Sequence, residues 1–241
     1  MNVIVSGYGR MGKAVEAVCL QRGHKVVAIV DGPDDWARIR PETKAVVIDF
    51  SLPDAAVQNI LRCFRLHLPV VSGTTGWYDQ LESVTRACAQ ANGTLMYAPN
   101  FSLGVNIFFH INKMLARAMA SAEGYRVSLS ETHHIHKLDA PSGTALRLAD
   151  DILSLHPKLK TWKNAPADDP EVLPVISYRK GEVPGTHEVV YDSEVDTLSL
   201  KHEAKSRKGF ALGAVLAAEF VYDKKGVFTM EDYLETLGIR Q

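Results

Sequence analysis

A glycine-rich turn that directly follows an apolar run constrains the fold of this chain more than any other feature. Residues 2–6 are predicted to form a buried strand, and the turn is Gly7-Tyr8-Gly9-Arg10-Met11-Gly12. In a strand–turn–helix unit, the first glycine permits the tight turn, the second lets a pyrophosphate approach the backbone, and the third lets the helix pack closely on the strand. Apolar residues then recur at helical spacing over residues 10–21. The sequence therefore predicts a dinucleotide at the N-terminus of this helix.

The acid that ends the second predicted strand bears on the choice of cofactor. Asp31 follows the apolar run 25–30, about twenty residues after the turn, where an acid accepts hydrogen bonds from the adenosine ribose hydroxyls. Its carboxylate repels a 2′-phosphate, and Gly32 beside it offers no positive charge, so these two residues favour NADH. Arg10 and Lys13 lie close enough in sequence to counter a phosphate, so NADPH stays open.

The first hundred residues alternate apolar runs with helical patterns, which is typical of a parallel sheet covered on both faces. Strands are expected at 2–6, 25–30, 44–50, 69–72 and 94–98, and helices at 10–21, 53–66 and 77–91. In such a sheet, ligands bind at the carboxyl ends of the strands. Two loops at those ends are predicted either to line the cofactor or to be plain strand–helix turns: Gly73-Thr74-Thr75-Gly76 and Ala98-Pro99-Asn100-Phe101-Ser102.

The pattern changes near residue 100, which indicates a second domain of the α+β class. Its expected elements are helices at 105–121 and 142–155, a strand at 125–132, a polar loop at 157–174, and antiparallel strands at 175–179, 186–192 and 197–203. Two final helices, at 209–222 and 230–237, are able to return to the first domain.

Composition excludes several classes of function. With a formal net charge of −1, the chain lacks the broad positive field that nucleic-acid binding usually needs. No apolar run reaches the length of a membrane span. No secretory signal is recognisable at the N-terminus, so we expect a cytoplasmic protein. The cysteines Cys19, Cys63 and Cys88 fall in helical patterns and are predicted to be buried thiols, with neither a disulfide framework nor a zinc site.

The densest chemistry in the chain lies at 131–145, where a strand ends and a helix begins. His133, His134, His136 and Lys137 place three imidazoles and one ammonium in five positions. Histidine passes protons near neutral pH, and lysine holds anions or donates a proton. Ser142-Gly143-Thr144 then opens the helix with hydroxyl and N–H groups that suit a carboxylate.

Three interpretations of this segment compete. His134 and His136 share one face of an extended strand, so they could bind a metal together with His187 or His202. A solvated loop is the second interpretation. We favour the third, an anion-binding catalytic cluster without metal, because no cysteine or carboxylate cluster joins the histidines at the usual spacing of metal ligands.

Six segments together resemble the 4-hydroxy-tetrahydrodipicolinate reductase (dihydrodipicolinate reductase) family of bacterial and plant lysine biosynthesis. They are 7–12, 73–76, 98–106, 131–145, 183–187 and 202–207. The matches follow the same order along nearly the whole chain, and the pattern His-His-x-x-Lys-x-Asp-Ala-Pro-Ser-Gly-Thr-Ala is highly specific.

The resemblance implies an α/β fold with an N-terminal Rossmann dinucleotide-binding domain, residues 1–102 and 208–241, and a second α+β domain, residues 103–207, for substrate binding and oligomerisation. It implies a homotetramer that reduces a cyclic dicarboxylate with NADH or NADPH and releases water. His133 would be the acid–base residue and Lys137 the proton donor. The substrate-binding residues would be His134, Lys137, Ser142, Gly143 and Thr144. The cofactor would contact Gly7, Tyr8, Gly9, Arg10, Met11, Gly12, Asp31, Gly73, Thr74, Thr75, Ala98, Pro99, Asn100 and Phe101.

Two departures from the family pattern concern the adenosine side. Many members carry a basic residue where this chain has Gly32, and the connection from Asp31 to Asp49 is short. Two rival functions stay open from the sequence: another two-domain dehydrogenase of the aspartate or homoserine type, and a protein that senses NAD(H) without chemistry. The histidine and lysine cluster argues against the sensor, because a sensor needs no proton donor beside a nicotinamide.

Overall fold

The structure is a computed structural model that describes residues 1–40 and 43–239. The chain forms two compact units, one from Met1–Asn106 with Arg207–Gln241 and one from Ile107–Ser206. Sequence analysis places the boundaries at 102/103 and 207/208, a few residues from these positions.

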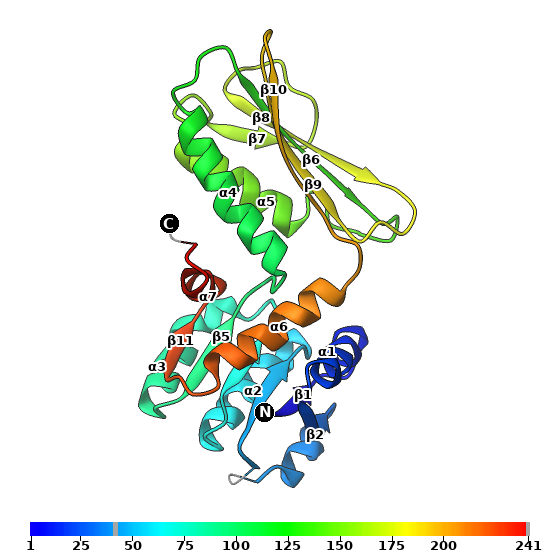
Figure 1. The fold of residues 1–241 in the computed structure, drawn as a ribbon, viewed down its shortest axis with the longest axis vertical. Coiled ribbons are helices and arrows are strands. Elements are labelled where there is room, and N and C mark those ends of the chain that lie inside the picture. Colours follow the sequence, from blue (N-terminus) through cyan, green and yellow to red (C-terminus); the bar gives the residue numbers. More distant parts are fainter. Residues whose placement is uncertain (41–42, 240–241) are drawn as a thin grey trace. The chain divides into compact units, whose positions relative to one another are not determined.

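The first unit is built around a parallel sheet whose strand order is β11-β5-β4-β3-β1-β2 (Figure 1). The strands are β1 (Asn2–Ser6), β2 (Lys25–Val30), β3 (Ala45–Asp49), β4 (Val70–Ser72), β5 (Thr94–Tyr97) and β11 (Gly226–Phe228). The chain runs from β1 outward to β2 and then returns to the other side of β1 for β3. This reversal creates a switch point between β1 and β3, where the loops at the carboxyl ends diverge and leave room for a ligand. The predicted parallel sheet is confirmed, and β11 is an additional strand.

Helices cover both faces of this sheet because successive strand residues point to opposite sides. Val3 and Val5 pack with α1 (Arg10–Gln21) and α6 (Lys208–Val221), whereas Ile4 packs with α2 (Pro53–Arg65) and α3 (Leu81–Gln90). A 3₁₀ helix, η1 (Pro33–Arg38), follows β2; η3 (Tyr78–Gln80) leads into α3; and α7 (Met230–Thr236) follows β11. The last two α-helices of the chain are therefore part of the first unit.

The contact between α6 and the loop after β5 is unusually close. A Cβ atom at Gly213 would overlap the carbonyl oxygen of Phe101, so only glycine lets the helix rest on this backbone. Phe101 is itself fully buried in the core cluster that contains the α6 alanines. The loop at 98–102 is therefore held in place by α6, which comes from the C-terminal part of the chain.

The second unit has a mixed sheet with strand order β10-β9-β6-β8-β7. Its strands are β6 (Arg126–His133), β7 (Thr161–Lys163), β8 (Val172–Arg179), β9 (Thr186–Asp192) and β10 (Thr197–Glu203). α5 (Gly143–Leu155) packs on β6 and β8, and the amide of Asn112 in α4 (Leu103–Met119) donates to the carbonyl of Leu148 in α5.

Two parts of this sheet correct the sequence expectations. The strand expected at 175–179 begins at Val172 and runs parallel to β6, because the α5 crossover between them returns the chain in the same direction. The loop expected at 157–174 contains β7 and the start of β8. β7 is too short to show alternation, and Pro174 within the run argues against a strand.

Two smaller expectations can also be checked. All three cysteines are buried free thiols. Among the described residues, no helix combines the length and apolar character needed to cross a membrane.

Gly213 and Gly209 form a matched pair for testing the contact between α6 and the loop after β5. A Cβ at Gly209 would only touch the hydroxyl of Ser102, at 3.7 Å. We expect Gly213→Ala to lower the free energy of unfolding by about 2–3 kcal/mol, because overpacking forces the backbones apart. Gly209→Ala should leave it unchanged or raise it by about 0.5 kcal/mol. Urea unfolding followed by circular dichroism measures both, and equal values for the two variants would contradict the close contact.

Candidate active site

The glycine turn after β1 has the shape that its sequence requires. Gly7 has a φ of +82°, and a Cβ there would overlap the carbonyl of Phe50. A Cβ at Gly12 would overlap the carbonyl oxygen of Gly7, whereas one at Gly9 would meet no described atom within 4 Å. Gly7 and Gly12 are therefore needed for packing, and Gly9 leaves open space for a group that approaches the backbone.

The N-terminus of α1 is suited to an anion. Gly9 is its N-cap, and within the described helix no side chain caps the first turn and no acid lies in it. The N–H groups of that turn are consequently available, and the helix dipole favours negative charge there. This observation supports the fit of a dinucleotide pyrophosphate to this end of the helix.

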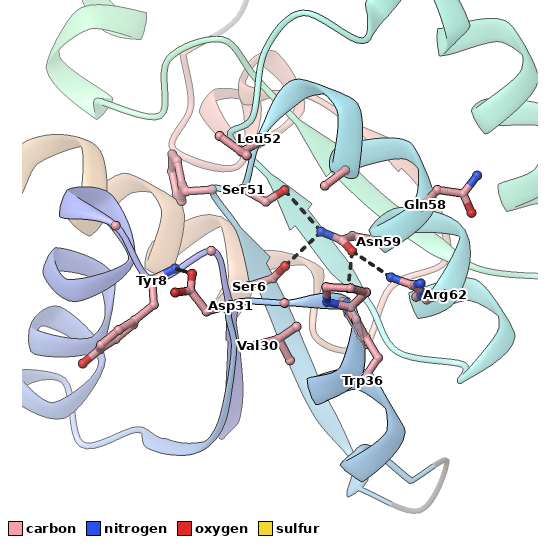
Figure 2. A pocket seen from close by; sticks show the side chains of 16 residues that line it. Ser6, Tyr8, Val30, Asp31, Trp36, Ser51, Leu52, Gln58, Asn59 and Arg62 are labelled. Atoms are coloured by element: carbon pink, nitrogen blue, oxygen red, sulfur yellow. Dashed lines mark hydrogen bonds between the residues drawn. The ribbon is translucent and has the colours of Figure 1, made fainter.

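A cavity of about 640 Å³ opens beside the turn, at the carboxyl ends of β1, β2 and β3 (Figure 2). Gly7, Gly9, Asp31, Trp36 and Arg62 are among the residues that line it. The cavity lies at the switch point between β1 and β3, where an open parallel sheet binds its ligand. Its volume lies within the range of small-molecule and cofactor sites.

Acidic side chains dominate the end of β2. Asp31 is exposed, and one of its carboxylate oxygens accepts a hydrogen bond of 2.7 Å from the backbone N–H of Tyr8 (Figure 2). Asp35 accepts from the backbone N–H groups of Asp31 and Gly32, at 3.0 and 3.1 Å. These two hydrogen bonds hold the pKa of Asp35 below its usual value. The N–H groups of Asp31 and Gly32 are therefore already bound to a carboxylate.

A buried carboxyl group joins the strand ends beneath the cavity. Asp49, at the end of β3, is fully buried and accepts hydrogen bonds from Ser6 and Thr74, both at 2.7 Å. Asn59 of α2 donates to Asp49 at 3.3 Å, and its amide oxygen accepts from the Trp36 indole (Figure 2). Sequence reasoning did not identify Asp49 or Asn59. A polar residue at the end of an otherwise apolar strand was the signal available for Asp49.

The other predicted cofactor residues fall into two groups. The first group is exposed or half-buried and contains Arg10, Met11, Gly73, Thr75, Pro99 and Asn100. The second group is buried and contains Thr74, Ala98 and Phe101. The Thr74 hydroxyl donates to Asp49 and accepts from the backbone N–H of Ser51. This hydroxyl is therefore committed to the protein, and Thr74 has a supporting position in the loop.

The predicted catalytic segment begins on one face of β6. Val127, Leu129, Glu131 and His133 are all buried, whereas the residues between them are only half-buried. Because side chains alternate along a strand, these four share a face, and it is the face that packs on α5. The apolar face of β6 thus changes to a carboxylate and an imidazole at its carboxyl end.

Glu131 is the centre of this cluster. Its side chain is 0% exposed, and both of its oxygens accept from the backbone N–H of Ser142, at 3.1 and 3.2 Å. The Arg179 guanidinium lies 3.5 Å from one oxygen, and Nδ1 of His133 lies 3.2 Å from the other. Burial raises the pKa of Glu131, but the interaction with His133 and the hydrogen bond from Ser142 outweigh it and hold the pKa well below its usual range. Glu131 is therefore ionised at neutral pH.

His187 from β9 completes the buried cluster. Its Nε2 lies 3.1 Å from the Ser142 hydroxyl and 3.7 Å from a Glu131 oxygen. Burial, with a smaller contribution from His133, lowers the pKa of His187 to about 3, so this ring is neutral near pH 7. Glu131, His133 and His187 offer ligand atoms within 4.8 Å of one another, a grouping that can hold a metal ion. It differs from the histidine pair that sequence analysis considered.

Lys137 lies in the loop between β6 and α5. Its ammonium is 2.7 and 2.8 Å from the two oxygens of Asp139. Arg179 donates to the carbonyl oxygens of Lys137 and Asp139, at 3.2 and 2.6 Å, so one guanidinium braces both this loop and Glu131. Sequence reasoning gave no role to Arg179, which lies beside His133 in the register of β6 and β8.

The start of α5 is a helix N-terminus that is capped by a side chain. Ser142 is the N-cap, and its hydroxyl accepts from the N–H of Ala145. Ser142 is buried and its polar groups are engaged, whereas Gly143 is exposed and Thr144 is half-buried. His134 is half-buried, with its ring centroid 6.2 Å from that of His136. The available groups near the helix start are those of Gly143 and Thr144.

A glycine turn at the switch point of a parallel sheet, together with a second unit that carries an acid–base cluster, defines a dinucleotide-dependent oxidoreductase. Comparison with known proteins narrows the class. The family model described as dihydrodipicolinate reductase, N-terminus, matches residues 1–101, and the one described as dihydrodipicolinate reductase, C-terminus, matches residues 104–234. The chain belongs to the dihydrodipicolinate reductase family.

Individual relatives agree with this assignment. The chain is 47% identical over 237 residues to a 4-hydroxy-tetrahydrodipicolinate reductase of Christiangramia forsetii, covering 98% of this chain and 99% of that protein. It is 36% identical to the enzyme of the same name from Neisseria gonorrhoeae, covering 78% of this chain and 72% of that protein. A structure of dipicolinate-bound dihydrodipicolinate reductase from Paenisporosarcina sp. TG-14 has the same fold, with a TM-score of 0.76, 22% identity, and coverage of 95% and 97% of the two chains.

The low pKa of His187 predicts how stability depends on pH. Between the ordinary histidine pKa of about 6.5 and the folded value, the unfolded chain binds a proton that the folded chain does not. The contribution of neutral His187 to the free energy of unfolding is thus fully present above about pH 6.5 and is lost as the pH falls toward 3. The free energy of unfolding of the wild type decreases between about pH 6.5 and about pH 5. We expect His187→Asn to make this decrease about 1–2 kcal/mol smaller.

Urea unfolding at a series of pH values measures this dependence. His136→Asn is the matched control, because it makes the same substitution at an exposed histidine. Identical pH dependence in the wild type and in His187→Asn would show that His187 does not resist protonation.

Proposed function

We propose that this protein catalyses the reduction of 4-hydroxy-tetrahydrodipicolinate to tetrahydrodipicolinate in lysine and diaminopimelate biosynthesis. In the balanced reaction, 4-hydroxy-tetrahydrodipicolinate, NAD(P)H and one proton give tetrahydrodipicolinate, NAD(P)⁺ and water. The observation that carries the proposal is the segment that contains His133 and Lys137, which ends at the N-terminus of α5. The relative that is 47% identical over nearly the whole chain is named for this activity.

The proposed substrate site matches the charges of a dicarboxylate. The N–H groups of Gly143 and Thr144, at the positive end of a helix dipole, would hold one carboxylate, and His134 would assist. Lys137 supplies the second positive group, and Asp139 holds its ammonium in place until substrate arrives. Ser142 supports this site by capping the helix and contacts Glu131 and His187.

We assign the proton chemistry to His133 and Lys137. Reduction places negative charge on an atom beside the reduced carbon, and a cationic side chain at that atom lowers the barrier and returns a proton. Lys137 would be that donor, and His133 would exchange protons as the acid–base residue. Arg179 holds the backbone of the Lys137 loop, so the donor starts from a fixed position.

The proposed cofactor is NADH or NADPH, which supplies the hydride when it is bound. The first turn of α1 and Gly9 would hold the pyrophosphate, and Asp31 would hold the adenosine ribose. We propose a preference for NADH, because Asp35 already occupies the N–H groups of Asp31 and Gly32 and adds a second negative charge where a 2′-phosphate would lie. The homotetramer and the cytoplasmic location stay predictions.

The roles of His133 and Lys137 can be tested by substitution. We expect His133→Ala and Lys137→Ala each to lower kcat by about a hundredfold or more, because each removes a group that moves protons or stabilises charge. Binding of NADH should be unchanged, because the proposed cofactor residues all lie in the first unit. The assay supplies enzymically generated 4-hydroxy-tetrahydrodipicolinate and follows the oxidation of NADH and NADPH.

His136→Ala is the matched control, since His136 is an exposed imidazole in the same segment. Near-normal kcat in both the His133 and the Lys137 variants would contradict the assigned roles. Failure of the wild-type protein to reduce this substrate would contradict the proposed activity itself.

The cofactor preference can be tested at Asp31. Asp31→Ala should weaken NADH binding about tenfold or more, because a hydrogen bond to a charged group contributes about 1.5 kcal/mol or more. NADPH binding should weaken less, because the same change removes a repulsive charge. Fluorescence titration with both nucleotides measures this, with Asp79→Ala as the exposed control. Equal weakening of both nucleotides would contradict a contact between Asp31 and the ribose.

A further inference from the structure

We propose that Glu131 is a positioning residue that fixes the imidazole of His133. It keeps Nδ1 of this ring toward its own carboxylate and leaves Nε2 as the atom that exchanges the proton. It also ties His133 to the start of α5, where the substrate carboxylate would bind. The inference rests on the proposed function in one respect, the acid–base role of His133.

The two side chains are neighbours because of the period of a strand. Glu131 and His133 are two residues apart on β6, so they project from the same face. Both are buried, and the 3.2 Å between Nδ1 and a Glu131 oxygen is short enough for an ion pair, although the ring is not yet aligned as a full hydrogen bond. A carboxylate at this distance favours a proton on Nδ1.

The carboxylate is itself held from two sides, so it can act as a fixed reference. The backbone N–H of Ser142 contacts both oxygens, and Arg179 from β8 contacts the oxygen that does not face His133. The N-cap position of Ser142 means that the positive end of α5 adds to the neutralisation of the charge. Glu131 thereby keeps one oxygen directed at His133.

The surroundings of the imidazole favour the same orientation. His187 packs against His133 edge-on, with ring centroids 5.1 Å apart, and it is neutral, so it does not compete as a cation for Glu131. A Cβ at Gly185 would lie 3.0 Å from Nε2 of His133. Glycine at that position therefore leaves space beside the nitrogen that we assign to proton exchange.

The contacts of Glu131 also balance its buried negative charge without a metal ion. Glu131, His133 and His187 can in principle hold a cation, but Arg179 and the Ser142 N–H already compensate the carboxylate. Lys137 also acts as a positive charge on His187, which opposes the binding of a metal cation in the same place. We therefore assign the carboxylate to His133.

The first test compares Glu131→Gln with Glu131→Asp. In other enzymes, loss of the group that orients a histidine lowers activity between about tenfold and about 10⁴-fold. We expect Glu131→Gln to lower kcat at least tenfold while the KM for NADH stays near the wild-type value. The melting temperature should fall, because the substitution removes the buried charge that compensates the Arg179 guanidinium. Glu131→Asp retains the charge and should recover part of kcat. Glu182→Gln is the matched control, because Glu182 is an exposed carboxylate 3.5 Å from the exposed His136.

The second test reads the ring directly and does not depend on turnover. ¹⁵N-histidine NMR at a pH of about 8, above the ordinary titration range of histidine, should show the His133 proton on Nδ1 in the wild type. His133→Gln assigns the signal. In Glu131→Gln, the proton should distribute between Nδ1 and Nε2. A wild-type proton on Nε2, or full kcat in Glu131→Gln, would overturn the proposal.

The two proposals fail in different ways. Normal kcat in His133→Ala contradicts the proposed function, whereas normal kcat in Glu131→Gln with loss of activity in His133→Ala contradicts only the positioning role. If Glu131→Gln does not fold, the wild-type NMR signal and the Glu131→Asp variant still decide the matter. Unchanged kcat in the presence of EDTA supports the assignment over a bound metal, and loss of kcat that Zn²⁺ restores would overturn it.

Discussion

A carboxyl group buried at the end of a strand must have its oxygens satisfied, and each unit of this protein contains one that organises its surroundings. Leaving such a group without partners costs several kcal/mol or more. Asp49 in the first unit collects donors from Ser6, Thr74 and Asn59. Glu131 in the second collects the N–H of Ser142 and the guanidinium of Arg179. Because the donors come from different elements, each carboxyl group sets the relative positions of the loops that carry the proposed chemistry.

The need to satisfy these two buried carboxyl groups explains why some residues of the loops face inward. Thr74 lies in the loop after β4, yet its hydroxyl is directed to Asp49. Ser142 opens α5, yet its hydroxyl caps the helix and its N–H contacts Glu131. Their neighbours Thr75 and Gly143 are exposed. In each loop one residue anchors the backbone to a buried carboxyl group, and the next is exposed.

The sequence was sufficient for features that depend on local rules. The glycine turn, the parallel sheet and the helix after Ser142 follow from spacing, and the structure contains them. The direction of β8 was mistaken because pairing depends on the α5 crossover. Asp49 and Arg179 were missed because each acts through residues distant in sequence. Glu131 itself was predictable in part, since a strand whose buried face changes from valine and leucine to glutamate and histidine indicates a polar site at its end.

The proposed cofactor preference depends on more than one residue at the end of β2. A basic residue at position 32 would sit between Asp31 and Asp35, and Asp35 holds the backbone of both 31 and 32 through its hydrogen bonds. A phosphate would have to displace that carboxylate from those N–H groups and also face the charge of Asp31. Arg38 lies 3.7 Å from Asp35 and is already paired with it. The proposed discrimination against a 2′-phosphate would therefore be distributed over the turn from β2 into η1, and reversing it would require changes at both acids as well as at Gly32.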